Sequence, residues 1–444
     1  MNQRSPLERF LAIFTEVKAG EGGTALFLTL NIFLILTAYY IIKPVREALI
    51  LSVEGGAEWK IYTAAGQSLL LLGAIPLYAR LASRVSRRRL INWVTVFFVS
   101  NLVFFFIAVT LVRESSLILG IGFFLWVGVF NVMVPAQFWS FANDIYTVEQ
   151  GKRLFAIVAF GASSGAVVGS WITRQNIESL GLGNLLLMSG GLLLVALAIT
   201  AIVERRESRQ AREQNVAPQE EPLPEGNAFS LVWRSRYLLL IAFLMLFLNW
   251  VNSTGEYILS DMVKAAIEKQ ADSSGLVGAA RSEWVEESIG GFYASFFGVV
   301  NVIALLMQLF LVSRIIKYIG VRVALLILPC IALGGYALLF AIPLLGVVRW
   351  AKTAENATDY SLLNTIRQAL FLPTTREEKY KAKQVIDTFF MRAGDVAAAV
   401  VVGVGVGALG LSGRQFALVN LGLVVVWLVL AIRIGREYRR LTDE

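Results

Sequence analysis

Long apolar stretches are the main feature of this chain of 444 residues, and about twelve of them are each long enough to cross a lipid bilayer. A spanning helix needs roughly 20 consecutive, mostly apolar residues. The mean hydropathy of +0.66 is too high, and the share of charged residues, 16%, too low, for a soluble globule of this length. The sequence therefore predicts an all-α polytopic membrane protein. The stretches begin near Ala25, Trp59, Leu90, Leu117, Leu154, Leu182, Tyr237, Gly290, Val323, Leu344, Gln384 and Phe416.

The composition argues against several classes of chemistry. Histidine is absent and Cys330 is the only cysteine, so no intramolecular disulfide can form, and we expect neither a metal site nor a cofactor. Residues 161–165, Gly-Ala-Ser-Ser-Gly, match the pattern around a hydrolase nucleophile, but a triad without histidine is not expected in a membrane helix. No Walker A sequence occurs. We therefore expect a protein that is not an enzyme.

The basic residues predict the sidedness of the chain. The net charge of +8 is better explained by Lys and Arg in cytoplasmic loops than by nucleic acid, which we do not expect as a partner. If the spans are even in number and both ends lie inside, most Lys and Arg residues fall on the inner side, and few, such as Lys60, fall outside. We predict cytoplasmic N and C termini, and the inner membrane if the source is bacterial. Helical spacing from Leu7 to Val17 predicts an amphipathic helix on the lipid surface, with no signal peptide.

A charged, proline-containing segment at 204–235 divides the chain into two halves and predicts a cytoplasmic linker. We expect an N-terminal segment at 1–23, a six-helix half at 24–203, a second six-helix half at 236–434 and a cytoplasmic tail at 435–444.

The two halves repeat each other. Arg84 and Arg314 lie in similar basic loops, and the same number of residues separates Arg153 from Lys383. Glu47 matches Glu256 at a shorter offset, because the outer segment near 263–288 has no counterpart in the first half. Two parallel six-helix repeats are the plan of the major facilitator fold, in which a solute binds near the midplane and the halves move around it.

Charged side chains inside the spans mark the candidate site, because each costs roughly 2.5–3.5 kcal/mol at the centre of a membrane helix. Such residues normally face a cavity or a partner. The predicted intramembrane cations are Lys43, Arg46, Arg349, Lys352, Arg367 and Arg392, and the candidate acids are Glu47, Asp144, Glu256, Asp261, Glu355, Asp359, Asp387 and Asp395.

At the end of the first span, Lys43, Arg46 and Glu47 lie within about one helical turn. Two cations and one acid leave a net positive charge, which favours binding of an anionic solute. The alternative is that Arg46 and Glu47 contribute to salt bridges between helices.

In the seventh span, Asn249, Asn252, Ser253 and Glu256 share one helical face. Glu256 takes the repeat position of Glu47, and this symmetric pair of carboxylates is predicted either to hold cations in the other half or to carry a coupling proton.

The tenth span carries the most polar residues. Lys352, Tyr360 and Arg367 lie on or near one stripe, which is expected to face a cavity or the interior of the bundle. Lys352 and Arg367 have the chemistry to bind phosphate oxygens, and Tyr360 can stack on a base, although membrane aromatics more often serve in packing.

Glycines at 161, 165 and 169 form a stripe of small residues in the fifth span. Such a stripe predicts a close contact with another helix.

A basic segment before the eleventh span resembles the signature of the nucleotide transporter family, the ATP/ADP translocases of plastids and obligate intracellular bacteria. Lys379, Lys381 and Lys383 alternate, and Val385, Ile386 and Asp387 follow. The end of the first span, from Lys43 to Glu58, is also similar to that family. The resemblance implies exchange of ATP for ADP, with membrane lysines and glutamates needed for transport. Carried over by position, the residues are Arg46, Glu47, Glu256, Lys381 and Lys383.

Three functions are open at this point. The first is nucleotide exchange by alternating access without hydrolysis, in a monomer surrounded by membrane lipids. The second is transport of another phosphorylated or amphiphilic solute. The third is a membrane sensor or scaffold without flux, which has less need for charged residues in its interior. The predicted substrate-binding residues are Lys43, Arg46, Glu47, Glu256, Lys352, Tyr360, Arg367, Lys381 and Lys383.

Overall fold

The structure is a computed structural model that describes residues 6, 17–18, 20–112, 116–146, 148–214, 228–375, 378 and 382–442. Most of the amphipathic helix predicted at 7–17, and two of the signature lysines, Lys379 and Lys381, lie outside these residues.

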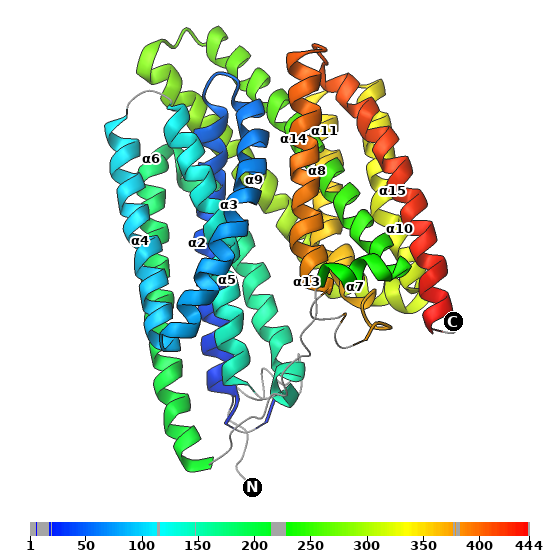
Figure 1. Cartoon of the computed structure of the whole chain (residues 1–444). Coiled ribbons are helices and arrows are strands. Elements are labelled where there is room, and N and C mark those ends of the chain that lie inside the picture. The colour runs from blue at the N-terminus through cyan, green and yellow to red at the C-terminus, as the bar shows by residue number, and fades with distance from the viewer. Residues whose placement is uncertain are drawn as a thin grey trace. The chain divides into compact units, whose positions relative to one another are not determined.

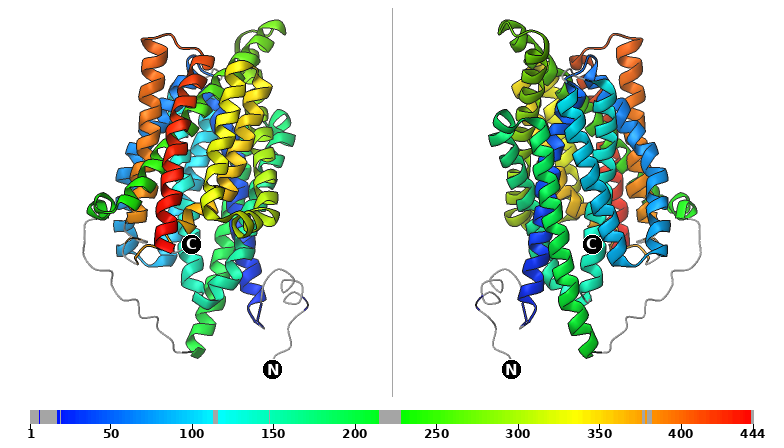
Figure 2. Two further views of the ribbon diagram at one scale, coloured as in Figure 1. Left: turned by 90° about the vertical axis from the view of Figure 1, so that its right-hand side faces the viewer. Right: turned by 90° about the vertical axis from the view of Figure 1, so that its left-hand side faces the viewer.

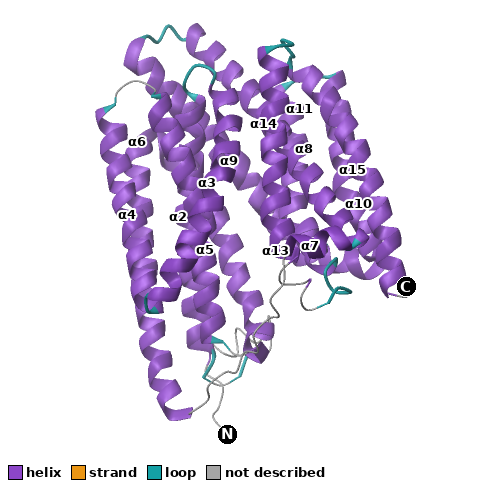
Figure 3. Ribbon diagram, viewed as in Figure 1, coloured by secondary structure: helices purple, strands orange, loops and turns teal. Residues whose placement is uncertain are grey.

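All regular secondary structure in the described residues is helical (Figures 1 and 3). The long helices of each unit defined below run roughly along one direction in the two side views (Figure 2). The helices are α2 (Gly22–Leu51), α3 (Gly56–Arg84), α4 (Arg87–Leu111), α5 (Leu117–Ile145), α6 (Val148–Gln214), α7 (Ala228–Arg234), α8 (Arg236–Ser273), α9 (Gly278–Phe310), α10 (Val312–Ala341), α11 (Leu345–Thr358), α12 (Asn364–Ala369), α13 (Lys383–Val385), α14 (Met391–Gly407) and α15 (Gly413–Thr442), with π-helical turns η1 (Asp359–Leu363) and η3 (Ile386–Phe390).

Nine helical segments in the described part of the chain are long and apolar enough to span a membrane, and one of them contains two spans. A continuous α6 of 67 residues would be about 100 Å long, more than three hydrocarbon thicknesses. Gly181, with φ of 71°, breaks the helix into two rods, because this left-handed conformation is readily available only to glycine. α3, with 29 residues, and the helical run at 345–369 are also long enough to cross a membrane. The twelve predicted spans are therefore accounted for.

The chain folds into two compact units, each made of separate segments. Unit 1 comprises Met1–Ser52, Leu70–Gln219 and Val277–Gly298. Unit 2 comprises Val53–Leu69, Glu220–Leu276 and Val299–Glu444. Two of the boundaries between units fall inside α3 and α9, and the others fall at 52/53, 219/220 and 276/277. The predicted division into halves at 24–203 and 236–434 stays a prediction.

The core of unit 1 is the contact between α2 and the first rod of α6. The carbonyl oxygens of Thr29, Phe33 and Thr37 approach the α-carbons of Gly161, Gly165 and Gly169 so closely that a β-carbon there would overlap them. The hydroxyl of Thr37 also donates a hydrogen bond to the Gly165 carbonyl at 3.2 Å. The close contact predicted from the glycine stripe is confirmed.

In unit 2, α8 packs against α14 and α15. Gly394 of α14 lies against the backbone of α8, where an added β-carbon would be 2.5 Å from the carbonyl oxygen of Leu246. Asn249 and Ser253 of α8 each donate a hydrogen bond of 2.7 Å to the Asp395 carboxylate of α14. The polar face predicted for the seventh span thus serves in part to join two helices.

The predicted linker at 204–235 contains regular structure where it is described. α6 continues to Gln214, and α7 covers Ala228–Arg234. Helix at the end of α6 fits its charged residues, since Glu and Arg are good helix formers, whereas α7 is mostly apolar.

Candidate functional site

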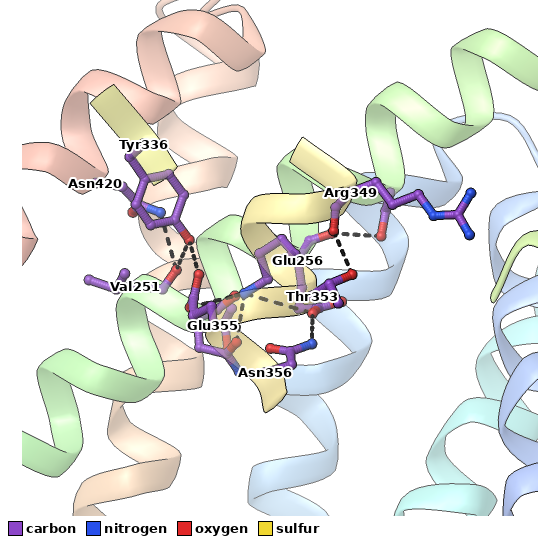
Figure 4. Close-up of polar contacts among 12 residues, drawn as sticks. Val251, Glu256, Tyr336, Arg349, Thr353, Glu355, Asn356 and Asn420 are labelled. Carbon is purple, nitrogen blue, oxygen red and sulfur yellow. Dashed lines mark hydrogen bonds and ion pairs between the residues drawn. The ribbon is translucent and has the colours of Figure 1, made fainter. Parts of the chain in front are cut away.

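Four charged residues from three helices meet inside unit 2 and form what we call the lysine–glutamate cluster. Its members are Lys60 of α3, Glu256 of α8, and Lys352 and Glu355 of α11. Figure 4 shows Glu256 and Glu355 together with their polar neighbours.

Lys352 lies at the centre of the cluster and its side chain is fully buried, with 0% exposure. Its ammonium donates hydrogen bonds to the Asn252 Oδ1 atom at 2.8 Å and to the Glu355 Oε1 atom at 3.0 Å. The Oε1 atom of Glu256 lies 3.8 Å from the same ammonium. A buried ammonium needs such partners, because desolvation of an unpaired charge costs several kcal/mol.

Glu355 is held firmly on its other side. The hydroxyl of Tyr336 donates to Glu355 Oε2 at 3.1 Å and also lies 3.3 Å from the carbonyl oxygen of Val251. That carbonyl accepts a further hydrogen bond from Asn420 at 3.1 Å (Figure 4). Helices α8, α10, α11 and α15 therefore fix the Glu355 carboxylate.

Glu256 has a different environment. Asn356 donates a hydrogen bond to its Oε1 atom at 3.1 Å, and its Oε2 atom lies 3.7 Å from the ammonium of Lys60. The same Lys60 ammonium donates to the hydroxyl of Ser260 at 2.8 Å. The Glu256 side chain is 21% exposed, more than any other member of the cluster.

Helical spacing explains how the cluster forms. Asn252, Glu256 and Ser260 recur every four residues on one face of α8, and Lys352 and Glu355 are one turn apart on α11. The predicted polar face of the seventh span is divided between two partners: Asn252 and Glu256 contact Lys352, while Asn249 and Ser253 contact Asp395. Two lysines and two glutamates leave the cluster with no net charge.

Lys60 is the member of the cluster that the sequence interpretation missed, since Lys60 was assigned to the outer loops. It is buried in α3. The sequence did contain a signal for the burial of Lys60, because the polar residues Thr63, Gln67 and Ser68 follow it at helical spacing. All three are buried in the structure. A polar face of this length near the start of a span indicates a helix that faces the interior.

The residues predicted in the first span lie in unit 1. Lys43 is buried, and its ammonium lies 3.8 Å from the centroid of the Phe297 ring and 5.3 Å from that of Tyr40, in the range of cation–π contacts. Arg46 pairs with the adjacent Glu47 through an Nε hydrogen bond of 3.1 Å, so this salt bridge lies within one helix rather than between helices.

Asp387 and Lys383, from the signature before the eleventh span, belong to a second charged group in unit 2. Asp387 lies in η3, 3.9 Å from the Nε atom of Arg367 and 3.9 Å from the ammonium of Lys383. Lys383 also donates to Gln368 at 2.7 Å. Two cations and one acid give this group an excess of one positive charge. Tyr360 is exposed in η1, and Lys381 lies outside the described residues.

Four of the six predicted cations, Arg46, Lys352, Arg367 and Arg392, thus lie beside a carboxylate. Each of these carboxylates offsets part of the positive charge predicted at membrane depth.

This charged interior within a bundle of membrane helices is the arrangement of a secondary transporter. Residues 25–374 match the family model of the Major Facilitator Superfamily, and the chain belongs to that superfamily. It is an integral, multi-pass membrane protein.

Known sequences add a more specific resemblance. The chain is 22% identical over 353 residues to ADP,ATP carrier protein 1 of Chlamydia pneumoniae, covering 69% of this chain and 65% of that protein. It is 22% identical over 350 residues to ADP,ATP carrier protein 1 of Chlamydia trachomatis serovar D, covering 69% and 63%. The match spans just under two thirds of the length of these relatives. The predicted resemblance to nucleotide transporters is confirmed.

Solved structures agree on the fold. The crystal structure of nucleoside transporter NupG is similar with a TM-score of 0.61 and 11% identity, covering 93% of this chain and 98% of that one. A bacterial homologue of the human lysosomal transporter Spinster, in an inward-facing and unoccupied conformation, gives a TM-score of 0.55 and 15% identity, covering 99% of both chains. At these identities the likeness concerns the fold alone.

Proposed function

We propose that this protein exchanges nucleotides of the ATP/ADP type across a membrane by alternating access. The observation that carries the proposal is Lys352, an ammonium buried at membrane depth beside the carboxylates of Glu256 and Glu355. An unneeded charge at that depth would be lost because of its cost. The similarity to ADP,ATP carrier proteins supports nucleotides as the substrate class.

The proposed substrate-binding residues fall into three groups. Lys43, Arg46 and Glu47 belong to α2, Glu256 and Lys352 to the lysine–glutamate cluster, and Tyr360, Arg367, Lys381 and Lys383 to the cytoplasmic part of the second half. The arginine and lysine side chains are suited to phosphate oxygens, and Tyr360 to the base. Transport of this kind requires no catalysed reaction, and we propose that the chain is not an enzyme.

We also propose the arrangement of the chain in the cell. Both termini lie in the cytoplasm, the membrane is the inner membrane if the source is bacterial, and the 24–203 and 236–434 halves of a monomer move about the 204–235 linker.

The test uses proteoliposomes containing the purified full-length chain. Labelled ADP should enter only when ATP or ADP is present inside. The double variant Lys352→Gln with Glu355→Gln removes the buried pair without leaving a lone charge, and should lower the exchange rate at least tenfold. Lys317→Gln, a change at an exposed lysine of α10, is the matched control and should leave exchange unchanged. Folded protein that takes up no nucleotide under any counter-substrate would rule out the proposal.

A second candidate is transport of another phosphorylated or amphiphilic solute. The carboxylates beside Arg46, Lys352 and Arg367 favour a solute that carries less negative charge than ATP. Saturable uptake of such a solute that excess ATP does not inhibit would identify this function. Ligand binding without any flux would instead identify a sensor.

A further inference from the structure

The two acids of the lysine–glutamate cluster are held very differently. Glu355 is 7% exposed and accepts hydrogen bonds from both Lys352 and Tyr336, at 3.0 and 3.1 Å. Glu256 is 21% exposed and lies 3.7 and 3.8 Å from Lys60 and Lys352. These two distances are at the long end for a contact ion pair, and the greater exposure of Glu256 leaves its carboxylate more room to move.

Charge balance limits how an anion can enter this cluster. With both acids in place, two positive and two negative charges cancel, and a further anion would meet repulsion from both carboxylates at short range. If Glu256 turns away, Lys60 and Lys352 each lose a carboxylate that lies within 3.8 Å of the ammonium, and an anionic oxygen can take its place beside these buried lysines. Displacement of Glu256 and arrival of an anionic oxygen therefore have to occur together.

We propose that Glu256 is an internal counter-anion, whose carboxylate occupies the place between Lys60 and Lys352 that a phosphate oxygen of the substrate takes on binding. This inference rests on the proposed function, because it requires an anionic substrate. It gives Glu256 a role opposite to that of a direct ligand: the carboxylate keeps the two lysines neutralised when substrate is absent and competes with substrate when it is present.

The direction in which one substitution changes the affinity for an anion distinguishes these two roles of Glu256. Glu256→Gln keeps the shape of the side chain and an oxygen that can accept from Asn356, but removes the negative charge. A displaced counter-anion predicts that inorganic pyrophosphate binds about five- to tenfold more tightly to this variant than to the unaltered protein. A direct ligand, or a proton carrier needed for binding, predicts weaker binding.

Glu355→Gln is the matched control. It removes a negative charge that lies closer to Lys352, but leaves the Glu256 carboxylate between Lys60 and Lys352. Its pyrophosphate affinity should rise less than that of Glu256→Gln. Equal tightening in both variants would mean that lowered negative charge alone is responsible, and would overturn the inference.

The measurement is isothermal titration calorimetry of the detergent-purified full chain with pyrophosphate and, separately, with ADP. Tighter pyrophosphate binding by Glu256→Gln supports the inference, including the case in which only the variant binds. Unchanged or weaker binding, with unaltered protein that binds, overturns the inference and leaves the proposed function standing. Binding of neither anion to any variant overturns both. If Glu256→Gln does not fold, Glu256→Asp withdraws the carboxylate by one methylene and should tighten binding to a smaller degree in the same direction.

Discussion

Gly255, one residue before Glu256 on α8, makes room for the lysine–glutamate cluster. A β-carbon at this position would overlap the hydroxyl of Tyr336 and lie 3.2 Å from the ammonium of Lys352. Tyr336 cannot move aside without losing its contacts with Glu355 and with the carbonyl oxygen of Val251. The absence of a side chain here is therefore part of the site.

We predict that Gly255→Ala lowers the free energy of unfolding by about 1–3 kcal/mol, the usual cost of inserting a methyl group into a packed interior. Thermal unfolding of the purified protein, followed by intrinsic fluorescence in detergent, measures the change. Gly334→Ala in α10 is the matched control, because no atom lies within 4 Å of the added β-carbon. The control should be neutral or slightly stabilising, and equal losses in both variants would contradict the role given to Gly255.

Glu21, directly before α2, is a carboxylate outside the spans that has several polar partners. Arg153 approaches it with two nitrogens, at 2.9 and 3.0 Å, and the backbone N–H of Lys18 donates at 2.9 Å. Burial by itself raises the pKa of Glu21, but the hydrogen bonds from Arg153, Lys18 and Gln150 and the charge of Arg153 outweigh it, so the pKa is lowered. Such charge-assisted hydrogen bonds contribute about 1.5–3 kcal/mol each.

The lowered pKa of Glu21 predicts a pH dependence of stability. A carboxyl group whose pKa is lower in the folded than in the unfolded state stabilises the fold at pH values above its ordinary pKa of 4.5. This contribution is lost as the pH falls through the pKa of the folded state. Glu21→Gln should therefore lower the melting temperature at pH 7 and have a shrinking effect as the pH falls below 4.5. Arg153→Gln should reproduce the loss, and the double variant should add little to either. A difference that does not depend on pH would contradict this explanation.

At the scale of elements, the contact between α2 and α6 rests on glycines that the sequence already marked. Gly165 lies so close to the carbonyl of Phe33 that the two helices touch by their backbones. Backbone contact of this kind provides close packing between membrane helices, where no hydrophobic driving force acts.

Gly165→Leu is expected to separate α2 from α6 and to destabilise the protein by at least 3 kcal/mol, or to prevent folding, because the side chain would meet backbone rather than a movable side chain. Gly191→Leu, in the second rod of α6, is the control, since nothing lies within 4 Å of its β-carbon. Size-exclusion chromatography of the detergent extract, with melting curves of the recovered protein, reports the outcome. Normal yield and stability of Gly165→Leu would show that the contact is looser than described.

Two helical runs that carry acids of the spans contain π-helical turns. Asp359 begins η1 and Asp387 lies in η3. A π turn inserts one residue and rotates the residues that follow it, and such turns recur at functional sites. Lys352 lies before η1, Tyr360 within it and Arg367 after it, and the three have separate environments: a buried cluster, an exposed position and the Asp387 group.

At the scale of the whole molecule, the distribution of basic residues predicts which ends face the cytoplasm. The single cysteine, Cys330, makes this testable after its replacement by Ser. In that background Ser273→Cys, in the predicted outer segment, should react with a membrane-impermeant maleimide in intact cells, whereas Thr442→Cys near the C terminus should react only after permeabilisation. The reverse pattern would invert the predicted topology.

Much of the fold could be predicted because lipid imposes simple local rules. Twelve apolar stretches, the glycine stripe and the repeat of basic loops are visible in the sequence, since each depends on residues near one another in the chain. Candidate charges such as Lys352 and Glu256 were also visible, because charge in an apolar span is conspicuous. Lys60 was missed because it stands near a span boundary, where a lysine is ordinary.

The sequence by itself determined that this chain crosses a membrane many times and carries charge at membrane depth, because the cost of leaving a polar group in hydrocarbon is set by the residue type and its position in a span. Only the tertiary structure decided which charge meets which. Lys352 contacts Glu355 on its own helix and Glu256 on α8, and Glu256 also contacts Lys60 on α3. Partners on different helices are selected by packing across many residues of separation, and no local pattern encodes that choice.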